Sequence, residues 1–380
     1  MTRLPDPRIG RVSPRPATAR GASATQPSGD TSGDPAGHTA GDPAGRSVAG
    51  RGALVDSHRR VATDLRVSLT DRCNLRCTYC MPADGLPWLP REDHLTDDEL
   101  LRLIRVYVGL GVTDVRLTGG EPLLRRGLAD IVARIAQIAP RPRIAMTTNG
   151  IGLAGLAGPL ADAGLDRINV SLDTLDPDAF ETMTRRARHQ DVVDGLAAAR
   201  AAGLTPVKVN AVAMRGINEH EVADLLAWCL DMDYPLRFIE QMPLDAQHSW
   251  HRESMVTADE VRTRLGERFE LTPLPAGSRG SSPAELFLVD GGPRTVGIIA
   301  SVTAPFCGDC DRTRLTADGQ VRNCLFAARE TDLRGPLRAG AGDETIAGLI
   351  RGEMWRKLPG HGIGTEGFHQ PDRPMSSIGG

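Results

Sequence analysis

The sequence lacks both a long hydrophobic run and a large excess of charge. No stretch of eighteen apolar residues occurs in its 380 residues, so we expect no membrane-spanning helix. Its 45 lysines and arginines nearly balance 48 aspartates and glutamates, which leaves a formal net charge of −3. A chain this close to neutral has no global attraction for nucleic acid. Any polyanionic ligand must therefore be bound by a local concentration of cations.

Aromatic residues and cysteines are also scarce. Aromatic residues make up 4% of the chain, which gives no indication of a large partner surface. The seven cysteines are too few and too unevenly placed for a disulfide framework. This indicates a reducing compartment, so we expect a cytoplasmic protein. The hydrophobic share of 40% is ordinary for a globular chain.

Residues 1–57 have a different composition from the rest. They are rich in glycine, proline, alanine, serine and threonine, and Gly-Asp-Pro-Ala-Gly occurs at Gly33 and again at Gly41. Too few branched or aromatic side chains are present to offset the entropy of ordering, so we expect a disordered tail. The segment has neither the apolar core of a signal peptide nor the acid-poor amphipathic pattern of a transit peptide.

From residue 58 onward, β-branched runs alternate with helical patterns. The expected strands are Leu65–Leu69, Val112–Thr118, Arg143–Thr148, Arg167–Leu172, Pro206–Val212 and Leu236–Glu240. Helical spacing over 96–109 begins with Thr96 and Glu99, which predict a capping box. Alternating units predict an α/β fold with a parallel sheet. Six units suit an open (βα)6 partial TIM barrel over 58–240, with an α+β extension over 241–380 and functional residues at the strands' carboxyl ends.

Six of the seven cysteines fall into two incomplete ligand sets. They are Cys73, Cys77 and Cys80, spaced C-x3-C-x2-C, and Cys307, Cys310 and Cys324, spaced C-x2-C-x13-C. Iron–sulfur cubes are normally held by four thiolates, so each set would leave one iron open. An open coordination position is typical of a catalytic site. The remaining Cys229 lies in an apolar helical stretch and is expected to be a buried core thiol.

Zinc binding is the alternative interpretation of both sets. Zinc takes four ligands, and the histidines nearest the first set, His58 and His94, are not at finger spacing. The second set could be completed by a distant His361 or His369. A non-enzymatic metal-binding module therefore stays open as an alternative function.

The first cysteine set, with the aromatic Tyr79 before its last cysteine, resembles the signature of the radical S-adenosylmethionine (SAM) superfamily. In the second set, the second cysteine, Cys310, is followed closely by Arg312-Thr-Arg314, and the chain ends in Gly379-Gly380. Together these features resemble the GTP 3′,8-cyclases of molybdenum-cofactor biosynthesis, from about Leu65 to the end. The resemblance implies a radical SAM partial barrel, two 4Fe–4S clusters, the second in the C-terminal extension, and SAM as cofactor.

The resemblance also implies the reaction. The cluster on the first set would cleave SAM, and the resulting radical would abstract the 3′ hydrogen of GTP. The product would be (8S)-3′,8-cyclo-7,8-dihydroguanosine 5′-triphosphate, formed by a lyase in the first step of molybdopterin biosynthesis. The second cluster would bind the guanine. Another radical SAM enzyme with an auxiliary cluster, acting on a peptide, is the alternative within the superfamily.

Site residues follow from the resemblance position by position. The implied SAM contacts are Tyr79, Gly120, Ser171 and Met242. The implied GTP contacts are Arg66, Arg116, Thr147, Lys208, Arg312 and Arg314, of which Arg66, Arg312 and Arg314 are also assigned to catalysis with the first three cysteines. Lys208 lies within an apolar strand, where an unpaired charge would cost several kcal/mol, so we expect it to face a polar cavity.

Two features leave questions for the structure. Asp114 stands where some relatives have a basic residue, which puts one phosphate contact in doubt. The terminal Gly379-Gly380 would enter the active site of its own chain by resemblance, although a frayed end or a carrier-type tail is also compatible with the sequence. The implied partners are a flavodoxin- or ferredoxin-type electron donor, cyclic pyranopterin monophosphate synthase downstream, and a second copy in a homodimer.

Overall fold

The computed structural model describes residues 52–275 and 277–379, so most of the segment expected to be a tail lies outside the described residues. Within the described part, Leu54 is fully buried. Its backbone N–H donates to Leu110 at 3.0 Å, and its carbonyl accepts from Ala62 at 2.8 Å. The packed part of the chain therefore begins a few residues before the boundary at 57 that composition suggested.

Strands and helices alternate through the first half of the described chain. The strands are β1 (Asp64–Ser68), β2 (Asp114–Thr118), β3 (Arg143–Thr148), β4 (Arg167–Ser171), β5 (Val207–Val212) and β6 (Leu236–Ile239). The helices are α1 (Asp97–Gly109), α2 (Leu128–Ala136), α3 (Leu153–Asp162), α4 (Pro177–Thr184), α5 (His189–Ala201) and α6 (Val222–Asp231). All six predicted strands are present, and the capping box of Thr96 and Glu99 is confirmed.

The C-terminal part extends the same sheet at both edges. Its strands are β7 (Leu271–Pro273), β8 (Glu285–Val289), β9 (Thr295–Ile299), β10 (Arg312–Leu315), β11 (Gln320–Arg322) and β12 (Thr331–Asp332). The strand order is β12-β11-β10-β1-β2-β3-β4-β5-β6-β9-β8-β7. Because β10 is parallel to β1 and β9 is parallel to β6, the parallel barrel continues past the six predicted strands. The predicted α/β partial barrel with an α+β extension is confirmed.

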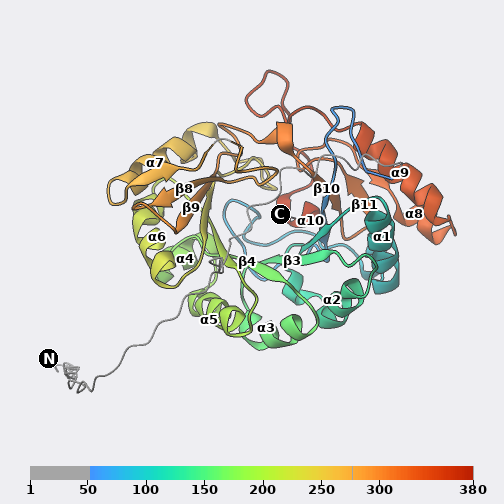
Figure 1. Ribbon diagram of the computed structural model, residues 1–380, viewed down its shortest axis with the longest axis horizontal. Helices are drawn as coiled ribbons and strands as arrows, with labels where there is room; N and C mark the ends of the chain where they lie inside the picture. Colours follow the sequence, from blue (N-terminus) through green and yellow to red (C-terminus); the bar gives the residue numbers. More distant parts are fainter. Residues whose placement is uncertain (1–51, 276, 380) are drawn as a thin grey trace, which may run out of the picture. The chain divides into compact units, whose positions relative to one another are not determined.

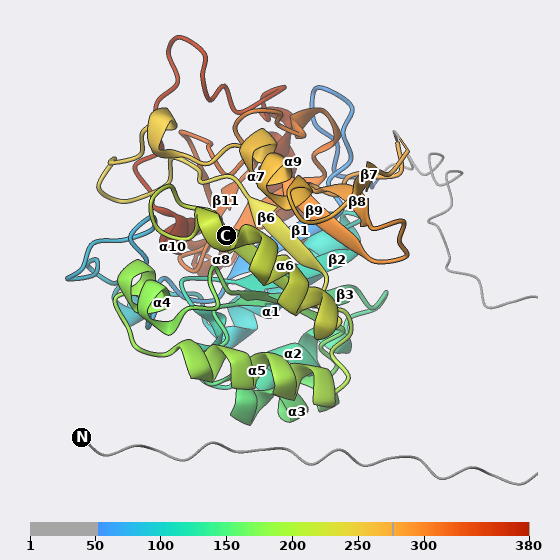
Figure 2. The same ribbon diagram turned by 90° about the vertical axis from the view of Figure 1, so that its left-hand side faces the viewer.

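Helices cover the outer face of this sheet. In Figure 1, α1, α2, α3 and α5 follow one another around the outside of the strands, and Figure 2 shows α6 with α7 (Ala258–Gly266) in front of β6 and β9. The remaining helices are α8 (Arg334–Arg338), α9 (Asp343–Trp355) and α10 (Met375–Ile378). The last of these lies with the C-terminal end inside the ring of strands (Figure 1).

The two faces of the sheet differ in chemistry because successive strand residues point to opposite sides. Leu65, Leu117, Val209 and Phe238 are at most 2% exposed and belong to the hydrophobic core that includes the helices. The residues that alternate with these apolar residues along each strand point to the inner face, and most of them are polar or charged. Burial of the apolar face therefore stabilises the sheet, while the inner face is left for ligands. No helix among the described residues is long and apolar enough to cross a membrane.

Replacing Leu54 with alanine should lower the free energy of unfolding by about 2–5 kcal/mol, because it removes a fully buried side chain. Urea unfolding followed by circular dichroism measures this. Val61→Ala is the control, since Val61 is 39% exposed and should change stability by less than about 0.5 kcal/mol. Equal effects of the two substitutions would show that the 52–62 segment is not packed as described.

Candidate active site

The first cysteine set lies on the loop that follows the carboxyl end of β1. The Cys73, Cys77 and Cys80 side chains are partly buried and near one another. Burial, with the neighbouring Cys73 thiol, raises the pKa of Cys80 to about 12. Hydrogen-bond donors face the sulfurs: the backbone N–H of Ser376 donates to Cys80, and the Asn149 Nδ2 lies 3.8 Å from the Cys73 Sγ. Such N–H groups suit thiolates that hold a metal cluster.

Paired glycines allow the end of β2 to pack against this loop. The Gly120 N–H donates to the Thr70 carbonyl at 2.7 Å. A Cβ on Gly120 would lie 2.3 Å from the Arg72 oxygen, and Gly119 has a φ of 153°. Only glycine fits such a close approach. The pair therefore holds the segment leading into Cys73, while the expected SAM contact of Gly120 stays a prediction.

Glu121 joins the ends of β2 and β3 beneath the loop. Its carboxylate accepts hydrogen bonds from the Thr148 hydroxyl at 2.6 Å and from the Asn149 backbone N–H at 2.7 Å. Burial raises its pKa to about 7. Asn149 in turn donates to Asn74 at 2.7 Å and reaches Cys73. Sequence reasoning missed Glu121 and Asn149, although Asn149 directly follows β3 and Glu121 lies three residues after the end of β2.

Tyr79 is held by a residue that the sequence analysis also missed. Its hydroxyl donates to the Asp173 Oδ2 at 2.7 Å, and the Val212 N–H donates to the other carboxylate oxygen at 2.8 Å. Burial raises the pKa of Asp173 to about 6. Asp173 lies two residues after Ser171, which ends β4 and remains a predicted SAM contact.

Met242, the other predicted SAM contact, lies in the loop after β6. It packs against a small apolar cluster that contains Met255, Val302 and Ile363. The structure therefore places it beside the C-terminal part of the chain, and its contact with SAM remains a prediction.

Cations line the inner face of the barrel. Register pairs Arg66 with Arg116 on one side and with Arg314 on the other. The register of the following strands places Lys208 on the same face. It also places Arg237 there, a residue that the sequence analysis missed. The face includes Arg66, Arg116, Arg167, Lys208, Arg237, Arg312 and Arg314, with Thr147 among them on β3. All the predicted GTP contacts therefore share one face.

These cations perturb one another. Burial and the neighbouring arginines lower the pKa of Lys208 to about 7 and that of Arg237 to about 10. Burial, then Arg312, lowers the pKa of Arg66 well below its usual range. Within the described residues, the Nε atoms of Arg66, Arg116 and Arg312 are buried without a hydrogen-bond partner. Buried donors are normally satisfied, so this face is built for an anionic ligand.

Asp114 has partners that explain its presence among these cations. Its carboxylate accepts from Arg143 at 2.7 Å and from Arg167 at 3.3 Å. The acidic residue therefore fixes Arg167, which sequence reasoning missed, at the base of the cationic face. The signal for Arg167 and Arg237 was available, since each is a charged residue beside apolar residues on a predicted strand.

The second cysteine set lies on loops beside β10. Cys307 begins a short 3-10 helix, Cys307–Asp309, and Cys324 follows β11. The thiols are near enough for Cys324 and Cys310 to raise the pKa of Cys307, although burial is the larger cause. Among the described residues, no three histidine, cysteine or acidic side chains converge on one point as ligands of a single ion would. In an iron–sulfur cube each thiolate binds its own iron, so the three sulfurs of a set do not have to converge on one point.

The histidine that could have completed a zinc site is engaged elsewhere. The Nε2 of His361 lies 2.9 Å from the Ser301 carbonyl, and its Nδ1 accepts from the Ile363 N–H at 3.0 Å. Its ring also packs at 5.1 Å from the Phe326 ring. His369 is exposed.

The C-terminal tail enters the barrel. The Arg314 Nη1 donates to the Gly379 carbonyl. A Cβ on Gly379 would lie 2.4 Å from the Thr118 Oγ1 and 3.2 Å from the Ser68 Cβ. Gly379 therefore packs against the carboxyl ends of β1 and β2. Gly380 lies outside the described residues.

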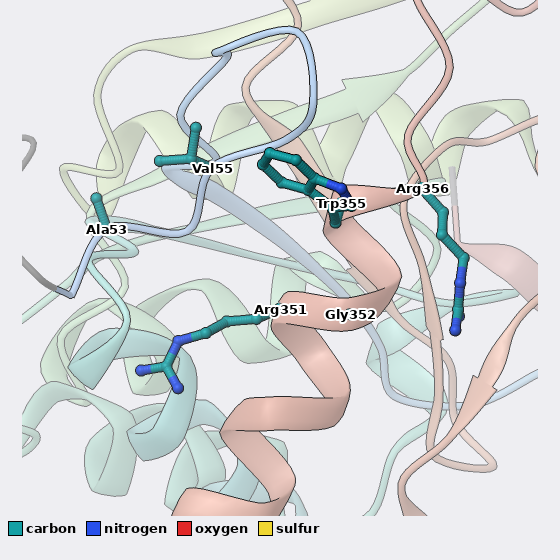
Figure 3. Close-up of a pocket in the computed structure, with 6 residues that line it drawn as sticks. All are labelled: Ala53, Val55, Arg351, Gly352, Trp355 and Arg356. Atoms are coloured by element: carbon teal, nitrogen blue, oxygen red, sulfur yellow. The ribbon is translucent and has the colours of Figure 1, made fainter.

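A separate cavity of about 530 Å³ lies between the N-terminal segment and α9. Figure 3 shows it lined by Ala53, Val55, Arg351, Gly352, Trp355 and Arg356. None of the predicted site residues lines this cavity.

Comparison with known proteins agrees with the fold. The model of the radical SAM superfamily matches residues 67–229, and that of Molybdenum Cofactor Synthesis C matches residues 234–363. A GTP 3′,8-cyclase of Streptomyces coelicolor is 64% identical over 88% of this chain and 99% of that protein. A GTP 3′,8-cyclase of Mycobacterium ulcerans is 61% identical over 87% of this chain and 93% of that protein.

The partial barrel and its three-cysteine loop define a radical SAM protein, which uses SAM and an iron–sulfur cluster. The chain belongs to the family of the GTP 3′,8-cyclases. The first cysteine set fits the superfamily's cluster because its thiols gather after the carboxyl end of β1, where Cys73 and Cys80 face N–H donors.

The titration of Lys208 predicts a pH-dependent affinity for inorganic triphosphate. Its pKa of about 7 in the free protein should rise when the anion binds, so binding takes up a proton. Affinity should therefore fall as pH rises from 7.5 to 9, by up to about tenfold per pH unit. Triphosphate itself still loses its last proton in this range, so each affinity is corrected for the measured ionisation of the free anion. Calorimetry measures the affinity and the proton uptake.

Lys208→Arg is the control for that titration, because arginine stays charged throughout the range. Its affinity should be nearly independent of pH. The same slope in both proteins would show that another group titrates.

Proposed function

We propose that the chain converts GTP to (8S)-3′,8-cyclo-7,8-dihydroguanosine 5′-triphosphate in the first step of molybdopterin biosynthesis. The observation that carries the proposal is the buried cationic face. Guanidinium N–H groups of Arg66, Arg116 and Arg312 have no partner among the described residues, and a polyanion could accept their hydrogen bonds. A nucleoside triphosphate supplies several negative charges in a row. Arginine forks match phosphate oxygens through paired hydrogen bonds. The GTP 3′,8-cyclase name of the relatives supplies the nucleotide and the reaction.

The residues of the face divide by position. Arg66, Arg116 and Lys208, together with Arg167 and Arg237, would bind phosphate oxygens across β1, β2, β4, β5 and β6. Thr147 would add a neutral contact from β3. Because a triphosphate would span several strands, the ribose would be fixed relative to the first cysteine set. Such positioning is worth large factors in rate.

SAM, bound at the first set, supplies the hydrogen-abstracting radical. The chain's residues orient the cofactor and keep water out. We assign Tyr79, Gly120, Ser171 and Met242 to SAM. The Tyr79 side chain is fixed by Asp173, and Gly120 is packed against the cysteine loop. Exclusion of water matters because a primary radical would otherwise be quenched by side reactions.

A second 4Fe–4S cluster on Cys307, Cys310 and Cys324 would hold the guanine. Support comes from the donors that face these sulfurs: the His361 backbone N–H at Cys307, and the Lys357 ammonium at Cys310. Arg312 and Arg314 lie on β10, between Cys310 and Cys324, and face the cationic row. Arg312 also lies over the Phe306 ring at 4.6 Å. They would hold the nucleotide between the two cysteine sets.

The proposed reaction also implies partners. Reductive cleavage of SAM needs a low-potential electron donor, for which we propose a flavodoxin- or ferredoxin-type protein. Cyclic pyranopterin monophosphate synthase would consume the product. We further propose a homodimer, by resemblance to the family.

The test is an anaerobic assay of iron-loaded protein with SAM, GTP and dithionite. Mass spectrometry should show 5′-deoxyadenosine and a product with the mass of GTP. Cys307→Ala should still yield 5′-deoxyadenosine but lose the cyclised product. Cys229→Ala, which changes a buried thiol far from both sets in sequence, should retain both. Deoxyadenosine without GTP conversion in the unaltered protein would favour a peptide substrate. The absence of both products would refute the radical SAM chemistry.

Removing Gly379 and Gly380 should lower cyclisation by about 100-fold or more, because Arg314 loses a partner inside the barrel. SAM binding should stay intact, since the deleted residues are not among the SAM contacts. Equilibrium binding of SAM and product formation are measured on the same preparation. A fully active truncated protein would show that the tail has no catalytic role.

A further inference from the structure

Lysine is almost absent from the chain. Of the 45 lysines and arginines, only Lys208 and Lys357 are lysine. Lys208 faces the cationic interior of the barrel, as described above. Lys357 is 3% exposed, so neither lysine is an ordinary surface cation.

Lys357 follows α9 and points its ammonium at the second cysteine set. Its Nζ lies 2.7 Å from the Arg312 carbonyl, 3.2 Å from the Cys310 carbonyl and 3.4 Å from the Cys310 Sγ. An ammonium has three donors, and these three acceptors use all of them. None of these acceptors is a carboxylate. A buried cation needs a counter-charge, and the Cys310 thiolate is the group positioned to supply it.

The segment after Lys357 is tied to the same cysteine set. Arg60 donates to the Leu358 carbonyl at 2.6 Å and to the Cys307 carbonyl at 2.6 Å. It also pairs with Asp56 at 2.6 Å. Arg60 therefore links the backbone after Lys357 to that of Cys307, which helps to hold the Lys357 side chain beside Cys310.

We propose that Lys357 tunes the second iron–sulfur cluster: its ammonium bonds to the Cys310 thiolate and raises the reduction potential of that cluster. The inference rests on the proposed function in that it requires a cluster on Cys307, Cys310 and Cys324. Net charge and hydrogen bonds to sulfur are main determinants of such potentials. A fixed positive charge beside one sulfur stabilises the state that carries the additional electron.

The test uses the full chain with Cys73, Cys77 and Cys80 replaced by alanine, so that only the second cluster assembles. Redox titration followed by electron paramagnetic resonance gives its midpoint potential. Lys357→Met should make reduction at least tenfold less favourable, a shift of about −59 mV for one electron. Arg356→Met is the matched control, because it removes one charge from the exposed neighbouring residue (Figure 3) and should shift the potential far less.

The outcomes separate the hypothesis of a second cluster from the hypothesis that Lys357 raises its potential. If the triple alanine variant with Lys357 intact assembles no cluster, the proposed second cluster is wrong. If it assembles one and Lys357→Met leaves the potential unchanged, the role of Lys357 is wrong and the cyclase proposal stands. If Lys357→Met fails to hold iron, Lys357→Gln decides, since it keeps an N–H donor without the charge. That variant should hold the cluster at a lowered potential, and either an unshifted potential or loss of iron would overturn the proposal.

Discussion

Mutual repulsion among buried cations is the constraint on which the rest of the structure depends. Arginines and a lysine from six strands share the inner face of one sheet, and like charges on neighbouring strands repel one another. Asp64 and Asp114 offset part of this: although burial opposes it, Arg66 and the neighbouring arginines lower the pKa of Asp64. The apolar outer face under the helices must stabilise the remainder. A polyanionic ligand would relieve the repulsion directly.

The cysteine loops depend on a second kind of interaction, namely buried polar groups that connect strand ends. Glu121 joins β2 to β3 and supports Asn149, while Asp173 joins β4 to β5 and supports Tyr79. Each carboxylate is buried and accepts several hydrogen bonds, which makes its position unique. Loops without secondary structure are thereby held nearly as firmly as the strands. A cluster that must present one iron to a small cofactor needs such support.

The C-terminal end of the chain links these regions. Ser376 donates to the Cys80 sulfur, and three residues later the Gly379 carbonyl accepts from Arg314 on β10. The tail therefore contacts the first cysteine loop and the cationic row within one turn of α10. Lys357, on the segment before it, contacts the second set. The last part of the chain thus contacts both cysteine sets and the cationic row.

The sequence by itself determined the local features. Alternation of apolar and polar residues located the six strands, side-chain spacing located the capping box, and cysteine spacing located both ligand sets. Only the tertiary structure decided which distant residues meet. Strands β9 and β10 extend the barrel, Arg167 and Arg237 join the cationic face, and Lys357 reaches Cys310 across 47 residues of sequence. Strand pairing and register between distant segments set these contacts, and local periodicity carries no information about either.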